Sequence, residues 1–84
     1  MMGLVQVAGD DTALVESLRE PLLRALMGRK RRYAVRVAAV GPMGEVLVSI
    51  TSSHGHVPLL FGRGELEAAY VSRVVGGAVE KNAF

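Results

Sequence analysis

Leucines recur at every fourth position early in the chain, and this spacing places them on one face of a helix. The stripe consists of Leu14, Leu18, Leu22 and Leu26. It predicts a helix over residues 12–27. Acceptor side chains in Asp10–Thr12 favour its start, and Gly28 favours its end. Pro21 lies inside this segment and predicts a kink or a restart of the helix.

Three segments then alternate between apolar and polar residues, which is typical of strands with one buried face. They span residues 33–40, 45–51 and 56–61. Short Gly- and Pro-containing connections join them, which favours an antiparallel meander. Pro58 in the third segment predicts that this strand lies at an edge of the sheet.

A second helix is predicted after Gly62-Arg63-Gly64. Its expected face holds Leu66, Tyr70, Val74 and Ala78, with Val71, Val75 and Val79 beside it. Gly76-Gly77 is costly in a helix, so we expect either fraying there or close packing of the backbone against the sheet. A further expectation is a short N-terminal strand over Leu4–Val7.

These elements define an α+β fold of order α-β-β-β-α, with a three-stranded antiparallel sheet, two helices on one face and the additional N-terminal strand. Residues 1–84 form one small domain. The chain has no cysteine, so its stability must come from an apolar core. Hydrophobic residues make up 50% of the chain, more than so small a core usually consumes, which indicates either a surface for a partner or a place inside a larger assembly.

Charge is distributed unevenly along the chain, although the net charge is only +2. The bases concentrate in one segment, as Arg29, Lys30, Arg31, Arg32 and Arg36. Such a run fits contact with phosphate groups. It also fits the end of a helix, where positive charge complements the dipole and stays solvated. Both interpretations remain open.

The order of elements resembles the double-stranded-RNA-binding domain family. Family features appear here as Tyr33 opening a strand, Gly41-Pro42 at the first turn, Gly62-Arg63-Gly64 before the second helix, and Ala78 late in that helix. The stretch GHVPLLFGRGELEAAYVSRVVGGAVEKN is also similar to the N-terminal half of a small-subunit ribosomal protein family with a variant of this fold. The resemblance covers residues 12–82 and implies association with RNA.

Two departures from the family pattern bear on function. Family members carry a lysine cluster at the start of the second helix, where this chain has Glu65 and Glu67. The loop after Gly41-Pro42 has Met43-Gly44 in place of the family's histidine. RNA contact would therefore fall to the basic segment, with Arg63 added. Family modules without the lysines commonly serve as protein-interaction or dimerisation units.

The sequence contains only weak signals for a catalytic or a metal-binding site. His54 and His56 supply at most two ligands, with no cysteine and no clearly aimed carboxylate. Ser52 and Ser53 lie next to His54 without the glycine elbow of a serine nucleophile. We therefore expect no enzyme activity, no metal and no cofactor.

Two functions follow from the sequence. The first is a small non-catalytic RNA-associated module, in the manner of a ribonucleoprotein component, that contacts phosphates through Arg29, Lys30, Arg31, Arg32, Arg36 and Arg63. The alternative is a protein-interaction or dimerisation module without nucleic-acid binding, with a protein partner or a second copy. No membrane span or secretory signal is recognisable, so the expected location is the cytoplasm or the interior of an organelle.

Overall fold

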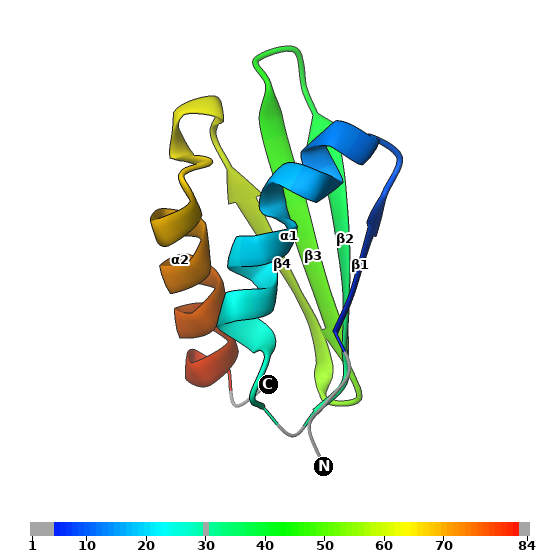
Figure 1. Cartoon of the computed structure of the whole chain (residues 1–84), viewed down its shortest axis with the longest axis vertical. Coiled ribbons are helices and arrows are strands. Elements are labelled where there is room, and N and C mark those ends of the chain that lie inside the picture. Colours follow the sequence, from blue (N-terminus) through cyan, green and yellow to red (C-terminus); the bar gives the residue numbers. More distant parts are fainter. Residues whose placement is uncertain (1–4, 30, 83–84) are drawn as a thin grey trace.

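The computed structural model describes residues 5–29 and 31–82. Its elements, in chain order, are β1 (Val5–Gly9), α1 (Thr12–Leu26), β2 (Tyr33–Val40), β3 (Glu45–Ser52), β4 (Gly55–Phe61), the 3₁₀ turn η1 (Arg63–Glu65) and α2 (Ala68–Lys81). Figure 1 shows the two helices side by side on one face of the sheet, while the other face is uncovered. The predicted α+β class is therefore confirmed.

The four strands form one sheet in the order β1-β2-β3-β4. β2, β3 and β4 are the predicted antiparallel meander. β1 is the expected N-terminal strand, with different bounds: it runs to Gly9, and Leu4 falls outside the described residues. β1 pairs in parallel with β2, with Val7 opposite Val35, because α1 carries the chain back across the sheet between them.

The turns have the backbone that their glycines predict. Gly41 and Gly44 bound the β2–β3 turn with φ of 75° and 78°, in the left-handed region that favours glycine. Pro58 lies on β4, which is an edge strand as predicted.

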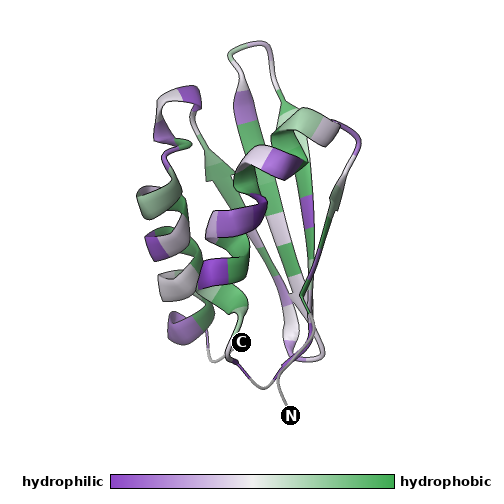
Figure 2. Ribbon diagram, in the orientation of Figure 1, coloured by the Kyte–Doolittle hydropathy of each residue, from purple (hydrophilic) through white to green (hydrophobic). Residues whose placement is uncertain are grey.

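Helix α1 begins at the predicted site, where the Asp11 side chain accepts a hydrogen bond from the Leu14 backbone N–H at 3.1 Å. The helix continues through Pro21, which is buried within it, so the predicted restart does not occur. Its buried face faces the sheet and α2, and its outer face is hydrophilic (Figure 2).

Helix α2 buries the three valines beside the expected stripe more deeply than the stripe itself. Val71, Val75 and Val79 are its buried residues, and the expected stripe, which includes Tyr70 and Val74, is half-buried beside them. The two interpretations of Gly76-Gly77 are both wrong. The helix runs on to Lys81, and a Cβ on Gly77 would meet no atom within 4 Å, so the backbone is not pressed against the sheet there.

The core lies between the helices and the inner face of the sheet, and it is wholly apolar apart from the Tyr33 hydroxyl. Each strand contributes alternate residues, among them Val37, Val48 and Phe61. The remaining side chains form the uncovered face, in rows that follow the register. One row is apolar (Ala38, Leu47, Leu60), the next is mixed (Ala8, Arg36, Ser49, Pro58), and the third is mainly polar (Gln6, Ala34, Thr51, His56).

Candidate anion-binding site

The basic run follows helix α1 at one end of the molecule. At this end the chain enters β2, β3 turns into β4, and α2 stops at Lys81. We call it the basic end and define it by Arg29, Arg31, Arg32 and Lys81. Lys30, a predicted site residue, lies outside the described residues.

Arg29 is already engaged within the molecule. Its Nε donates to the Ala25 carbonyl oxygen at 3.1 Å, and its Nη2 lies 3.5 Å from Glu80 Oε1. The side chain is 29% exposed. The first contact satisfies one of the carbonyls that a helix leaves unpaired at its C-terminus, and the second joins the ends of α1 and α2. Arg29 therefore closes the helix pair, a role that sequence reasoning missed.

Arg31 and Arg32 continue the basic end towards the sheet. Arg31 is half-buried and Arg32 is exposed. Tyr33, the next residue, is 3% exposed, so the chain enters the core directly after Arg32. The predicted strand start thus anchors the basic run at its C-terminal side, as Arg29 does at its N-terminal side.

Arg36 lies away from the basic end, on the uncovered face of β2. It lines a shallow depression together with Gln6, Ser49 and His56. Its Nη2 is 3.7 Å from Asp10 Oδ1, but the two side chains are 69% and 98% exposed, so this ion pair contributes little to stability.

Arg63 lies at the opposite end of the molecule. It opens η1, and its side chain packs on the β2–β3 turn, where a Cβ on Gly44 would lie 3.3 Å from Arg63 Cδ. The predicted residues are therefore distributed over three places: the basic end, the sheet face and the far end. The structure brings together Arg29, Arg31 and Arg32 and leaves Arg36 and Arg63 apart from them.

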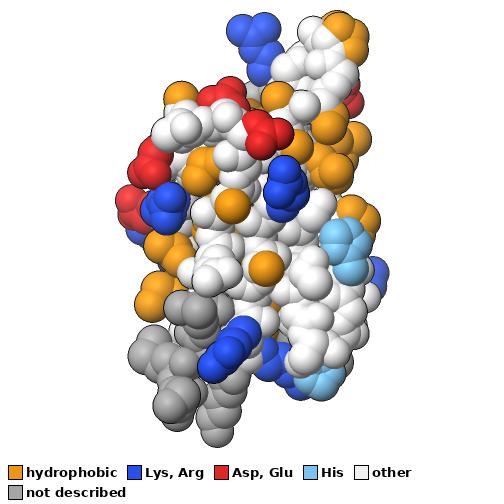
Figure 3. Space-filling model, turned by 90° about the vertical axis from the view of Figure 1, so that its right-hand side faces the viewer, with side chains coloured by type: hydrophobic (Ala, Val, Ile, Leu, Met, Phe, Trp, Pro, Cys, Tyr) orange, Lys and Arg blue, Asp and Glu red, His pale blue; other side chains and the backbone are white. Residues whose placement is uncertain are grey.

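Carboxylates gather at the end that holds Arg63, which we call the acidic end. They are Asp10, Asp11, Glu45, Glu65 and Glu67. In Figure 3, which views the molecule from the β1 side, the visible carboxylates lie in the upper half of the face. Both helices begin at the acidic end and finish at the basic end (Figure 1). Each charge cluster thus complements the helix dipoles beside it.

Glu65 has a structural part in the acidic end. Its Oε1 accepts from the Gly62 backbone N–H at 2.7 Å, and its Oε2 accepts from the Tyr70 hydroxyl at 3.3 Å. The start of α2, where the resembled family carries lysines, is therefore negatively charged and internally bonded. The sequence contains a signal for this separation of charge, because acids precede both helices, bases follow α1, and a base, Lys81, ends α2.

The surroundings of the two histidines, His54 and His56, do not resemble a metal site. The His56 Nδ1 is 3.0 Å from the Thr51 hydroxyl, across the β3–β4 pair. His54 lies in the turn, where its backbone N–H donates to the Ser52 hydroxyl at 3.0 Å. Within the described ranges, no three metal-ligating side chains come close enough to hold an ion.

No helix in the described part of the chain is long and apolar enough to cross a membrane. Comparison with known proteins finds no matching family model, no similar curated protein and no similar solved structure. The fold and the surface together define a small α+β domain with a mixed four-stranded sheet and charge separated along its length.

Proposed function

We propose that this protein is a small non-catalytic module that contacts the phosphate backbone of RNA through its basic end. The observation that carries the proposal is the gathering of Arg31, Arg32 and Lys81 at one end. Of the described carboxylates, Glu80 alone lies there, and Arg29 is its partner. A polyanion approaching this end meets a concentration of positive charge.

The chemistry of the basic end favours phosphate over bases. Stacking of unpaired bases requires exposed aromatic rings. Among the described aromatic side chains, Tyr33 is buried, and Phe61 and Tyr70 contact each other beside the acidic end, which leaves only the smaller imidazole rings of His54 and His56 exposed. A duplex, whose shape and backbone are read from outside, is therefore the better ligand.

The α-β-β-β-α order supports kinship in architecture with the double-stranded-RNA-binding domain, but the mode of contact must differ. Glu65 and Glu67 would repel phosphates at the start of α2. Arg36 and Arg63 are too far from the basic end to join one short contact, so we assign them no part in it.

The test is titration of a short RNA duplex by fluorescence anisotropy between about 50 mM and about 200 mM salt. Arg31→Ala/Arg32→Ala should weaken binding and reduce the slope of log affinity against log salt by up to ~1.8, because each lost phosphate contact removes about 0.9. Arg19→Ala/Arg24→Ala is the matched control, since it removes the same charge from the outer face of α1. Equal losses in both variants, or no loss in the first, would contradict the proposal.

A second candidate is a protein-interaction module without a nucleic-acid role. It is favoured by the apolar row on the uncovered face, where Leu60 is 59% exposed in line with Leu47 and Ala38. Such a row is typical of a contact surface. This candidate predicts no RNA binding even at about 50 mM salt. Its own measurement is binding of a hydrophobic dye, which Leu60→Lys should reduce without loss of stability.

A further inference from the structure

The outer edge of β1 is an open strand edge. β1 and β4 are the two edge strands, and only β4 carries a proline, Pro58, which removes a backbone donor. β1 has the sequence VQVAG, without proline or charge. Figure 3 faces this edge. Proteins usually block such edges with charge, proline or a covering element, so an edge without them is suited to pairing with another strand.

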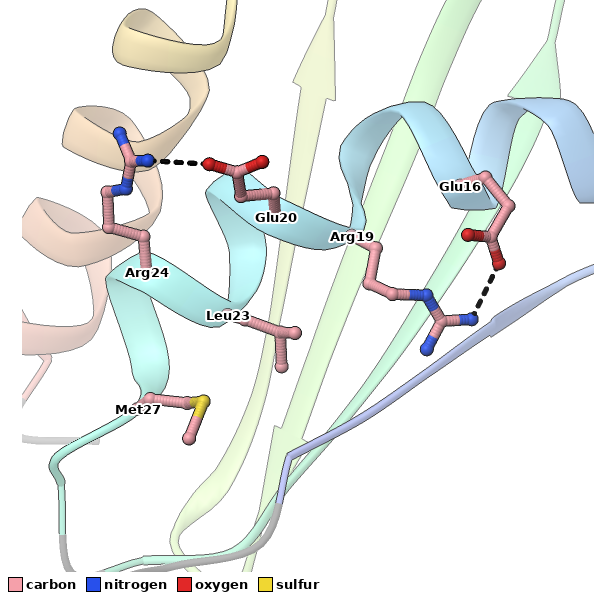
Figure 4. Close-up of a pocket in the computed structure, with 6 residues that line it drawn as sticks. All are labelled: Glu16, Arg19, Glu20, Leu23, Arg24 and Met27. Atoms are coloured by element: carbon pink, nitrogen blue, oxygen red, sulfur yellow. Dashed lines mark hydrogen bonds and ion pairs between the residues drawn. The ribbon is translucent and has the colours of Figure 1, made fainter.

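A groove on helix α1 lies on the side of the helix towards this edge. Its apolar lining is Leu23, which is half-buried, and Met27, which is 51% exposed. Figure 4 shows both side chains and Arg19 directed to the same side of α1 as β1. α1 and β1 are in contact with each other.

The rim of this groove carries four charges of alternating sign. The Arg19 guanidinium is 3.0 Å from the Glu16 carboxylate, and Arg24 is 2.7 Å from Glu20. From the N-terminus of α1 to its C-terminus, the signs of the charges are negative, positive, negative and positive, in the order Glu16, Arg19, Glu20, Arg24. From the C-terminus to the N-terminus, the order of signs is positive, negative, positive and negative. A second α1 lying antiparallel would therefore set each charge opposite one of the other sign.

We infer that the occupant of this surface is a second copy of the chain, paired through β1 in antiparallel fashion. The register with greatest overlap places Val7 opposite Val7 of the second copy and Gln6 opposite Ala8. It keeps the helices of both copies on one face of a continuous sheet. The two-fold axis makes the α1 helices antiparallel, so that the charged rims of the two copies run in opposite directions.

Self-complementarity is what selects a second copy over an unrelated strand. Any extended peptide fits the open edge, but an antiparallel second α1 also sets the charges along the rim opposite charges of the other sign. The inference is independent of the proposed RNA contact, because none of its residues belongs to the basic end.

The experiment measures the molar mass of the full chain by sedimentation equilibrium. The wild-type chain should give the mass of two copies. Gln6→Lys/Ala8→Lys sets lysine opposite lysine at both crossing positions, and it should raise the dissociation constant about tenfold or more. The matched control, Gln6→Glu/Ala8→Lys, sets glutamate opposite lysine and should remain a dimer.

Met27→Glu is an independent variant on the exposed part of the groove. It leaves the strand untouched, and it should also raise the dissociation constant if the α1 helices meet. Circular dichroism checks that each variant is folded. A monomeric wild-type chain at the highest concentration reached overturns the inference, as does a dimer that neither Met27→Glu nor the lysine pair weakens. A monomer that still binds RNA leaves the proposed function standing.

Discussion

Gly9 in β1 and Gly77 in α2 differ in the space that surrounds them. A Cβ on Gly9 would lie 2.3 Å from the Val37 carbonyl oxygen and 2.9 Å from Val15 Cγ2, so the end of β1 has no room for a side chain. A Cβ on Gly77 would meet nothing within 4 Å, although the residue lies inside α2. Gly9 therefore permits close packing, whereas Gly77 only lowers the stability of its helix.

The two sites predict opposite effects of the same substitution. Gly77→Ala should raise the free energy of unfolding by about 1 kcal/mol, because alanine is the better helix former by that amount. Gly9→Ala should lower it by more than about 1 kcal/mol, since β1 or α1 must shift. Urea denaturation of the two variants measures both. A stabilised Gly9→Ala would show that the end of β1 is not packed as described.

Asp11 fixes the first turn of α1 by its hydrogen bond to the Leu14 N–H. Asp11→Ala should cost about 0.5–2 kcal/mol of unfolding free energy, and Asp11→Asn should cost less because the amide oxygen still accepts. Thermal and urea unfolding provide the measurement. Equal losses in the two variants would mean that the charge of Asp11 beside the helix, and not its hydrogen bond, is what stabilises α1.

At the scale of elements, side-chain contacts of Glu65 and Tyr70 hold β4, η1 and α2 together. Glu65 bonds the Gly62 backbone and the Tyr70 hydroxyl, and Tyr70 in turn packs edge-to-face on Phe61, with ring centres 6.2 Å apart. The last residue of β4 and the first turn of α2 are thereby held together. The carboxylate that departs from the lysine pattern of the resembled family thus serves the fold.

Glu65→Ala should lower the unfolding free energy by about 1 kcal/mol, because the Gly62 N–H and the Tyr70 hydroxyl lose their acceptor. Glu65→Gln retains an acceptor and should lose less. Chemical denaturation compares the two variants, and Glu67→Gln is the control because the Glu67 side chain accepts no capping hydrogen bond at the start of α2. If Glu65→Ala is as stable as the wild type, water replaces the carboxylate fully at this exposed site.

The elements themselves were largely predictable from the sequence. Strand alternation and the glycines of the turns gave the start of β2 at Tyr33 and of β3 at Glu45 as they occur. Both signals are local, since side-chain alternation and positive φ depend on a few adjacent residues. β1 was predicted with different bounds, because a strand of five residues contains little periodicity to measure.

The orientation of α2 could not be predicted in the same way. Leu66, Tyr70 and Val74 form one apolar stripe, and Val71, Val75 and Val79 form another beside it. Which stripe is buried depends on where α1 and the sheet lie, and this is not encoded within the helix. The surroundings of Gly76 have the same origin, because the atom that a Cβ there would meet, at 3.8 Å, belongs to Arg29, far away in the sequence.

At the scale of the whole molecule, the candidate site was predictable only in part. Arg29, Arg31 and Arg32 are adjacent in sequence, so their grouping followed from the chain itself. Arg36 and Arg63 were added by sequence proximity and by resemblance, and the topology separates them from the run. Strand direction decides this: β2 carries the chain away from the basic end, and η1 lies beyond the end of β4.

The parallel course of the two helices has a consequence for how the molecule behaves at charged surfaces. The chain measures 39 Å along its longest dimension and 24 Å and 22 Å across. Because opposite charges lie at its two ends, the molecule has a large electric dipole moment although its net charge is only +2.

Near pH 7 and at low ionic strength, the protein should be retained by a cation exchanger and also by an anion exchanger, each holding a different end. Arg31→Ala/Arg32→Ala should elute earlier from the cation exchanger alone, and Asp10→Asn/Glu67→Gln earlier from the anion exchanger alone. Retention by the cation exchanger only would mean that net charge, and not orientation, governs adsorption.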